Sequence, residues 1–91
     1  MKIQNKTLLI TGGTGSFGTA VLHRFLHTDH FREIRIFSRD EKKQDDMRNL
    51  YKNDKIKYYI GDVRDYLSVE PATRGVDYIF HAAALKQVPS C

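Results

Sequence analysis

A short apolar segment that runs into a cluster of glycines is the feature that most restricts what this chain can fold into. Residues 7–11 (TLLIT) are apolar at their centre and show no polar alternation, which predicts a β-strand covered on both faces. Residues 12–18 (GGTGSFG) contain four glycines, and apolar side chains recur at helical spacing from residue 16 to about residue 28. A strand, a glycine-rich turn and an amphipathic helix in this order predict the first part of a βαβ unit.

The glycine spacing predicts a turn at which the backbone approaches a diphosphate. The three glycines that begin at Gly13 fit G-x-G-x-x-G, and the three that begin at Gly12 fit G-x-x-G-x-x-G. In both patterns the early glycine permits a tight turn. Gly15 then lets the main chain approach a pyrophosphate, and Gly18 lets the helix pack against the sheet. The free amides and the dipole at the helix N-terminus face the anion.

Two other interpretations of the glycine cluster are a nucleotide-triphosphatase P-loop and a turn that binds nothing. The gap between Gly13 and Gly18 suits a P-loop, but Thr19 stands where that motif requires its phosphate-binding lysine. A nucleotide triphosphatase is therefore not expected. The strand before the glycines and the helix after them supply the context of a dinucleotide site, which favours that site over an empty turn.

The rest of the chain continues the alternation of strands and helices. The expected strands are 33–38, 55–60 and 76–82, and the expected helices are 40–52 and 65–75. Pro71 lies within the last helix, which predicts a kink or two short turns, and Gly75 is placed to end it. The order predicts an α/β fold, the N-terminal part of a doubly wound parallel sheet. We expect strand order 3-2-1-4, three α/β/α layers and ligands at the carboxyl ends of the strands.

The residues after the second strand bear on which dinucleotide is bound. An NAD site places an acid about 20 residues after the last glycine, where it holds the ribose 2′-hydroxyl. At this position the chain has Ser38 and Arg39, followed closely by Lys43. A hydroxyl and a guanidinium suit a 2′-phosphate, so NADP is favoured over NAD. Asp40 is the complication, because NAD becomes possible if its carboxylate reaches the ribose instead.

Two further segments carry candidate cofactor contacts. In GDVRD, after the third strand, Asp62 is placed to accept a hydrogen bond from the adenine amino group and Val63 to pack on the ring. A plain turn before the next helix is the alternative. In HAAALK, after the fourth strand, small side chains from Ala82 onward leave room for a cofactor, although core packing explains them nearly as well. His81 is expected to be a hydrogen-bonded core residue rather than a catalytic one.

Composition and charge argue against several classes of function. The net charge is +4, but basic and acidic residues are interleaved, as in RDEKKQDDMR, so no nucleic-acid surface is expected. His23 and His27 lie four residues apart on the first helix, but no third ligand supports a metal site. The single cysteine, Cys91, and the lack of an apolar stretch of about 20 residues predict a cytoplasmic protein without a membrane span.

Four motifs taken together resemble one family. TGGTGSFG, FSRDEKK, GDVRD and HAAALKQVPS occur in the order and spacing of the extended short-chain dehydrogenase/reductases of bacterial polysaccharide synthesis. The chain is most similar to the CapD-like group, the inverting UDP-N-acetylglucosamine 4,6-dehydratases, often labelled UDP-glucose 4-epimerases. The resemblance covers residues 6–91 and implies that residues 1–91 are the N-terminal NAD(P)-binding part of a Rossmann fold, truncated before the catalytic and sugar-binding regions.

The resemblance also implies a role for each matching position. The pyrophosphate is bound by the glycine turn and the start of the helix, at Gly12, Thr14, Gly15, Ser16, Phe17 and Gly18. The adenosine 2′-phosphate is bound after the second strand, at Ser38, Arg39, Asp40 and Lys43. The adenine contacts Asp62 and Val63, the cofactor contacts Ala82, and both cofactor and nucleotide sugar contact Lys86.

Enzymes of this family oxidise the 4-hydroxyl of a nucleotide sugar by hydride transfer to the bound nicotinamide. In a 4,6-dehydratase, water is then lost across carbons 5 and 6 and the hydride returns to carbon 6. In a 4-epimerase the hydride returns to carbon 4 from the opposite face. Both reactions use a tyrosine and lysine in Tyr-x-x-x-Lys, which we expect beyond residue 91. Tyr51 and Lys55 match that spacing, but they precede the third strand and are taken as a chance match.

The sequence thus predicts the NADP-binding part of a nucleotide-sugar 4,6-dehydratase/5-epimerase acting on UDP-N-acetylglucosamine in capsule, lipopolysaccharide or glycan synthesis. The alternatives are a UDP-glucose 4-epimerase of the same superfamily and a non-catalytic dinucleotide-binding module. The full-length protein is expected to bind a UDP-sugar and to form a homo-oligomer. The 91-residue chain alone is expected to be inactive, with an uncovered fourth strand that favours aggregation.

Overall fold

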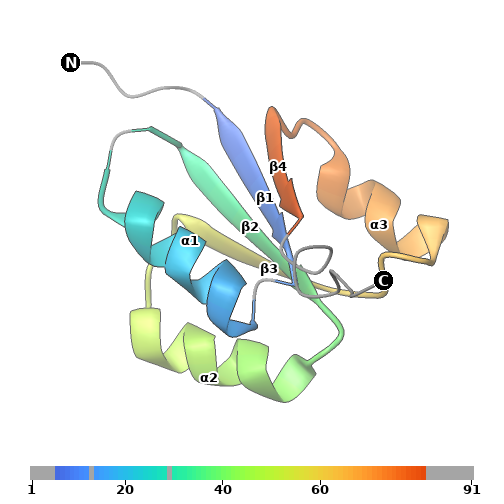
Figure 1. Ribbon diagram of the computed structural model, residues 1–91, viewed down its shortest axis with the longest axis horizontal. Coiled ribbons are helices and arrows are strands. Elements are labelled where there is room, and N and C mark those ends of the chain that lie inside the picture. Colours follow the sequence, from blue (N-terminus) through green and yellow to red (C-terminus); the bar gives the residue numbers. More distant parts are fainter. Residues whose placement is uncertain (1–5, 13, 29, 82–91) are drawn as a thin grey trace, which may run out of the picture.

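The computed structural model describes residues 6–12, 14–28 and 30–81. Strands and helices alternate along this part of the chain (Figure 1). The elements are β1 (Thr7–Thr11), α1 (Ser16–Leu26), β2 (Glu33–Ser38), α2 (Glu41–Tyr51), β3 (Ile56–Ile60), α3 (Tyr66–Thr73) and β4 (Tyr78–His81). Ala82 and Lys86, two of the expected contact residues, lie outside the described residues.

The four strands form one parallel sheet with the order β3-β2-β1-β4. Helices α1 and α2 cover one face and α3 covers the other (Figure 1). The predicted α/β fold, with strand order 3-2-1-4 and three layers, is therefore confirmed. No helix in the described part of the chain is long and apolar enough to cross a bilayer.

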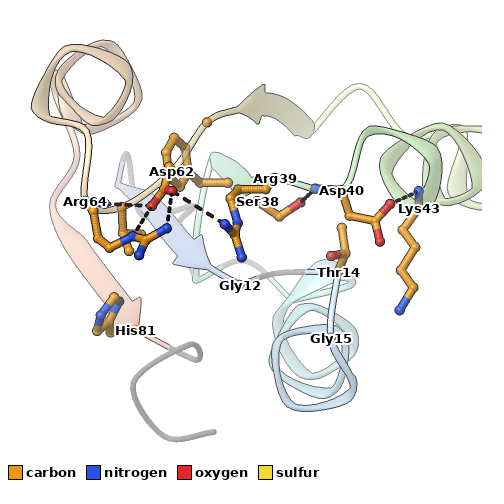
Figure 2. A pocket seen from close by; sticks show the side chains of 13 residues that line it. Gly12, Thr14, Gly15, Ser38, Arg39, Asp40, Lys43, Asp62, Arg64 and His81 are labelled. Atoms are coloured by element: carbon orange, nitrogen blue, oxygen red, sulfur yellow. Dashed lines mark hydrogen bonds and ion pairs between the residues drawn. The ribbon is translucent and has the colours of Figure 1, made fainter. Parts of the chain in front are cut away.

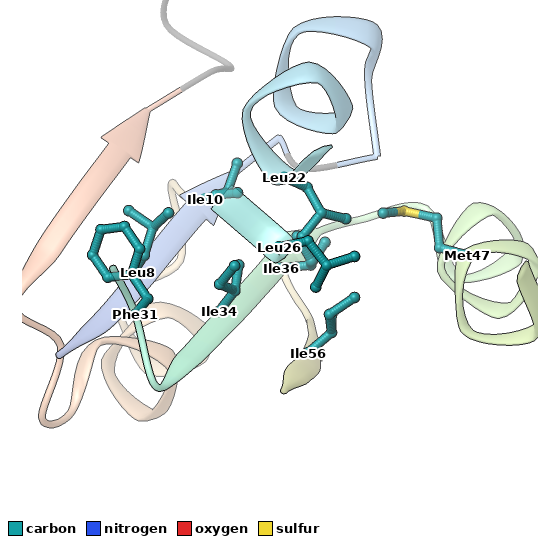
Figure 3. Packing of buried hydrophobic residues seen from close by; sticks show 9 residues of the cluster. All are labelled: Leu8, Ile10, Leu22, Leu26, Phe31, Ile34, Ile36, Met47 and Ile56. Carbon is teal, nitrogen blue, oxygen red and sulfur yellow. The ribbon is translucent and has the colours of Figure 1, made fainter. Parts of the chain in front are cut away.

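The sheet is buried most completely at β1, whose residues are all buried. Because side chains alternate across a strand, Leu8 and Ile10 join the core under α1 and α2, while Leu9 joins the core under α3. The larger cluster fills the space between the sheet and the two helices (Figure 3). Its members are Leu8, Ile10, Leu22, Leu26, Phe31, Ile34, Ile36, Met47 and Ile56.

Helices α2 and α3 begin at aspartates, as helix N-termini often do. Asp40 accepts a hydrogen bond from the Lys43 amide at 3.0 Å, and Asp65 accepts one from the Leu67 amide at 3.1 Å. Pro71 lies inside α3, which remains a single helix of eight residues and ends two residues later. The expected pair of short turns is therefore wrong, because Pro71 lies in the last turn of the helix, where the hydrogen bond that it removes interrupts little of the remaining structure.

The α3 face of the sheet is held as much by a charged side chain as by apolar packing. Ala72 is the buried residue of α3. Arg35 in β2 reaches the end of this helix and donates to the carbonyls of Ala72 at 2.9 Å and Arg74 at 2.7 Å. Gly75 follows at φ +76°, in the left-handed conformation expected for a glycine that ends a helix.

Candidate functional site

A cleft of about 740 Å³ opens at the carboxyl ends of β1, β2 and β3. Side chains from the turns after these three strands converge on it (Figure 2). This is where a doubly wound sheet binds its ligands. Its lining comprises Gly12, Thr14, Gly15, Phe37, Ser38, Arg39, Asp40, Lys43, Gly61, Asp62, Val63, Arg64 and His81.

The turn after β1 requires a glycine at one position because of its backbone conformation. Gly12 has a φ of +70°, which side-chain-bearing residues adopt only with strain. Its amide donates to the Phe37 carbonyl at 2.8 Å, and its carbonyl accepts from the Gly15 amide at 3.1 Å. The first bond attaches the turn to the end of β2, so that both lie at the same edge of the cleft, and the second closes the turn itself.

Helix α1 starts at the cleft, and no side chain among the described residues caps its N-terminus. Gly15 is its N-cap residue, with φ −81° and ψ 175°, and makes no side-chain hydrogen bond. The first intrahelical bond joins the Thr19 amide to the Gly15 carbonyl at 2.9 Å. The amides of Ser16, Phe17 and Gly18 precede that bond and have no acceptor within the helix. These amides, rather than side chains, are what α1 offers to an anion.

Side chains of the first turn of α1 contribute less than its amides. The ring of Phe17 is half exposed and lies 6.1 Å from the ring of Phe80. Gly18 is buried. The cleft lining does not include Ser16, Phe17 or Gly18. The predicted contact of these residues with a pyrophosphate would therefore be made by their backbone amides, and it stays a prediction.

The end of β2 provides a hydroxyl and two cations. Ser38 is only 8% exposed, and its Oγ accepts the amide hydrogen of Asp40 at 3.2 Å. The Arg39 side chain is 71% exposed and lies 3.6 Å from the Asp62 carboxylate. Asp40 uses one carboxylate oxygen to cap α2 through the amide of Lys43. Ser38, Arg39, Asp40 and Lys43 are thus brought together at one corner of the cleft, as predicted (Figure 2).

The turn after β3 is organised by a carboxylate–guanidinium pair. Asp62 accepts from the Arg64 amide at 2.9 Å and from the Arg64 guanidinium at 3.2 and 2.9 Å. These hydrogen bonds, with the positive charges of Arg64 and Arg39, lower the pKa of the Asp62 carboxyl to about 2. Val63 is exposed and lines the cleft beside this pair. Asp62 therefore stays ionised and faces two cations.

The Asp62 pair makes the turn after β3 sensitive to acid. The carboxyl pKa is about 2 in the folded chain against an ordinary value of 3.8, so its contribution to stability is complete above about pH 4 and is lost as the pH falls to about 2. We expect the Asp62 carboxyl resonance in an NMR titration to have its midpoint near pH 2. Arg64→Gln should move that midpoint toward 3.8, and a wild-type midpoint near 4 would show that the pair does not form in solution.

Gly61 precedes this turn and has no room for a side chain. A Cβ at this position would lie 2.7 Å from the Cβ and Oγ of Ser68 and 2.8 Å from Cζ of Phe37. Ser68 cannot move aside easily, because its hydroxyl accepts from the Asp62 amide at 3.1 Å and lies 3.0 Å from the Asp65 carbonyl. Gly61 thus allows the turn to lie directly on β2 and α3.

His81 differs from its predicted place in the core. It is exposed at the end of β4 and lines the cleft. Its Nδ1 is hydrogen-bonded to the Thr11 hydroxyl, so the expected hydrogen bond is present although the expected burial is not. The reason is that β4 lies at an edge of the described sheet, where Tyr78 and Ile79 are also more than half exposed.

The chance match to Tyr-x-x-x-Lys is used for packing. The Tyr51 hydroxyl lies 2.8 Å from Nε2 of His23 and joins α2 to α1. Lys55 donates to the carbonyls of Leu26 at 3.1 Å and Thr28 at 2.8 Å, which end α1. Neither side chain lines the cleft. Among the described residues no three histidine, cysteine, aspartate or glutamate side chains gather as metal ligands.

Three residues at or behind the cleft were not identified from the sequence. Arg64 follows Asp62 by two residues, the spacing of a local side-chain turn, and this was the available signal. No sequence signal identifies Gly61, since its role is visible only from the packed positions of Ser68 and Phe37. Gln44 is buried, and its spacing of three residues from Met47 places both on the inner face of α2.

Comparison with known proteins places this chain in a family. A family model described as "Polysaccharide biosynthesis protein" matches residues 8–91. The chain is 69% identical to a protein named UDP-glucose 4-epimerase from Rickettsia akari (strain Hartford) and 70% identical to one of that name from Rickettsia bellii (strain RML369-C). Each alignment covers 96% of this chain, which spans 26% of the length of these relatives.

Solved structures agree with the fold. The chain superimposes on Pen from Bacillus thuringiensis with a TM-score of 0.84 and 39% identity, over 97% of this chain and 27% of that one. It superimposes on a serine dehydrogenase, solved with NADP+, with a TM-score of 0.64 and 21% identity, over 78% of this chain and 27% of that one. The second similarity is one of fold alone. Because the family model spans nearly all of its length, the chain belongs to the polysaccharide biosynthesis protein family.

Proposed function

We propose that the described residues form the diphosphate and adenosine side of an NADP-binding site in a nucleotide-sugar-modifying enzyme. The observation that carries this proposal is the uncapped N-terminus of α1, which shares one cleft with the Ser38 hydroxyl and the Arg39 guanidinium. A dinucleotide with a 2′-phosphate carries anions at two separated points. The cleft has backbone donors at the start of α1 and cations after the end of β2.

The glycine turn suits the diphosphate. Gly12 and Gly15 place main chain without side chains at the cleft, and the first amides of α1 have no acceptor within the helix. Amides and dipole together stabilise an anion at such a terminus. Thr14 lines the same part of the cleft and adds a hydroxyl. The residues present therefore fit a dinucleotide diphosphate.

The corner after β2 suits a phosphate better than a ribose hydroxyl. An NAD site needs a carboxylate that is free to accept two ribose hydroxyl hydrogens. Asp40, between β2 and α2, lines this corner of the cleft, and one of its two carboxylate oxygens is already used to cap α2. Arg39 and Lys43 add positive charge to the same corner. These contacts support NADP over NAD.

The turn after β3 supplies the adenine side. Val63 is exposed at the cleft and offers an apolar surface to the ring. Asp62 stays ionised and holds Arg64, so an adenine amino group would share this carboxylate with the guanidinium. The predicted adenine contacts are thus compatible with the geometry, with Arg64 as an added neighbour.

For the whole protein we propose a UDP-N-acetylglucosamine 4,6-dehydratase, on the strength of the four motifs. The name of the Rickettsia relatives favours UDP-glucose 4-epimerisation as the second candidate. A bound nicotinamide supplies reversible hydride transfer in either case, and the tyrosine and lysine that move the proton are proposed to lie beyond residue 91. We further propose that the protein acts in the cytoplasm on a UDP-sugar and forms a homo-oligomer.

Product analysis separates these two reactions. A full-length protein that carries this chain would be incubated with UDP-N-acetylglucosamine and with UDP-glucose, and the products followed by NMR. A 4-keto-6-deoxy sugar supports dehydration, and UDP-galactose supports epimerisation. A properly folded full-length protein that binds NADP but converts neither sugar would instead be the non-catalytic dinucleotide module.

The binding proposal is tested at Arg39. In calorimetric titrations of a full-length protein that carries this chain, we expect Arg39→Ala to weaken NADP binding about tenfold, the effect of one charge-assisted hydrogen bond to phosphate. NAD binding should change less than about twofold, since NAD lacks that phosphate. Arg74→Ala is the matched control, because the Arg74 side chain is 74% exposed against 71% for Arg39 and pairs with Glu70 outside the cleft. Equal losses for both nucleotides would contradict the assignment.

A further inference from the structure

We infer that Gln44 is a positioning residue that turns the hydrogen of the Ser38 hydroxyl toward the cleft and thereby favours a phosphate there. The juxtaposition that carries this is a buried carboxamide directly behind a cleft-lining hydroxyl. The inference rests on the proposed dinucleotide site. It goes further by naming a residue outside the cleft that sets which ligand group is preferred.

Gln44 is held between two elements. It lies on α2 and is 1% exposed. Its Nε2 donates to the Tyr59 carbonyl at 2.9 Å and to the Ser38 Oγ at 3.0 Å. The carboxamide thus bridges the ends of β2 and β3 from beneath the cleft, and does not itself line it.

The orientation of this carboxamide is fixed by its partners. The Tyr59 group is a backbone carbonyl, which only accepts hydrogen bonds, so Nε2 and not Oε1 must face it. The opposite orientation would set two oxygens against each other. Within the described part of the chain Oε1 is buried and has no hydrogen-bond partner, which is unfavourable. The structure keeps Nε2 toward Ser38 despite that cost.

The Ser38 hydroxyl can consequently act toward the cleft only as a hydrogen-bond donor. A hydroxyl has one hydrogen and two acceptor lone pairs. Its Oγ accepts from the Asp40 amide at 3.2 Å and from Gln44 at 3.0 Å, which occupies both lone pairs. The hydrogen must therefore donate elsewhere, and Ser38 lines the cleft. The cleft thus meets a hydroxyl that can donate but cannot accept.

A hydroxyl restricted to donation discriminates between ligand groups. A bond from a hydroxyl to an ionised phosphate oxygen is about twice as strong as a neutral one. A ribose 2′-hydroxyl would have to act as an acceptor here and would gain less. Gln44 therefore strengthens the preference for a 2′-phosphate through Ser38, without touching the ligand.

Two substitutions remove the donor in different ways. Gln44→Met fills the space but has no hydrogen to donate. Gln44→Glu keeps the shape but offers at most one hydrogen in place of two, and Tyr59 is there to accept it, so the Ser38 hydrogen can turn inward. The probes are adenosine 2′,5′-bisphosphate and AMP, titrated by calorimetry into a full-length protein that carries this chain. Asn49→Met, at an exposed amide of the same helix, is the control.

We expect both Gln44 variants to bind the 2′,5′-bisphosphate about tenfold more weakly, while their affinity for AMP changes less than about twofold. A merely structural role would weaken both probes alike. In a double-mutant cycle with Ser38→Ala, which removes the hydroxyl, Gln44→Met should cause almost no further change in the ratio of the two affinities. An unchanged ratio in the single variants, or full additivity in the cycle, would overturn the inference.

The wild-type chain provides an independent test if a variant does not fold. Both carboxamide hydrogens of Gln44 are hydrogen-bonded and buried, so NMR should show slow exchange with solvent and a shift of their resonances when the 2′,5′-bisphosphate binds. Fast exchange and no shift would overturn the inference. If the wild-type protein binds neither NADP nor NAD, the proposed function itself is wrong. If it binds NADP and the Gln44 substitutions do not change the ratio of the two affinities, only the inference about Gln44 is wrong.

Discussion

Gly15→Asp is expected to stabilise the fold and at the same time abolish dinucleotide binding. The backbone of Gly15, at φ −81° and ψ 175°, is open to any residue, and an aspartate there would cap the uncapped α1. With the helix dipole this should raise the free energy of unfolding by about 0.5–1 kcal/mol. The same carboxylate would occupy the amides that we assign to the diphosphate and would repel it. Loss of two charge-assisted hydrogen bonds predicts at least about a hundredfold weaker NADP binding.

Urea denaturation and calorimetry of the same samples measure both effects. Gly12→Ala is the contrasting control, because Gly12 is at φ +70° and any side chain there is strained. It should lower the free energy of unfolding by about 1–2 kcal/mol. If Gly15→Asp left NADP affinity unchanged, the N-terminus of α1 would not be the diphosphate site, and the proposal would lose its main support.

Gly61→Val should be the most destabilising single substitution at the cleft. Its Cβ would lie 2.7 Å from the side chain of Ser68 and 2.8 Å from the ring of Phe37. Phe37 is 1% exposed in the core and Ser68 is fixed by hydrogen bonds, so neither can give way cheaply. We expect a loss of about 3 kcal/mol, the upper part of the range for overpacking. This is a large share of the stability of a chain of 91 residues.

Gly75→Ala separates crowding from backbone strain. Gly75 has a φ of +76°, but a Cβ there would meet nothing within 4 Å. Gly75→Ala should therefore lower the free energy of unfolding only through the strain of a left-handed backbone, by about 1 kcal/mol. Thermal unfolding followed by circular dichroism compares the two variants. Similar losses at both positions would mean that Gly61 is not sterically required and that the turn after β3 can shift away from Phe37.

The fold could be predicted because each strand carried a local signal. The buried run at Thr7–Thr11 and the alternation of Ile34 and Ile36 with Arg35 each specify which faces are covered, and crossover chirality then leaves few topologies. The pair of short turns expected at Pro71 does not form, because the penalty of a proline in a helix interior was applied to a residue that lies in the last turn of α3. His81 was misjudged because burial at a sheet edge depends on neighbours that a local pattern does not contain.

The site was predictable only where a residue acts through its own position in a motif. Ser38 and Arg39 follow a strand at a set distance from the glycines, and the structure brings both to the cleft. Gln44 acts through Tyr59 and Ser38, which are 15 and 6 residues away, and no spacing rule connects them. Gly61 acts through a close approach that exists only after β2 and α3 have packed.

The hydrogen bonds from Arg35 to the end of α3 have a consequence for the dynamics of the cleft. A helix with one buried side chain, whose end is tied by a guanidinium to two carbonyls, detaches at a lower free energy than helices seated on a large apolar cluster. The turn that carries Asp62 is anchored to this helix through Ser68. Partial detachment would widen the end of the cleft that we assign to adenine while the glycine turn stays in place, so a nucleotide bound as we propose would release its base before its diphosphate.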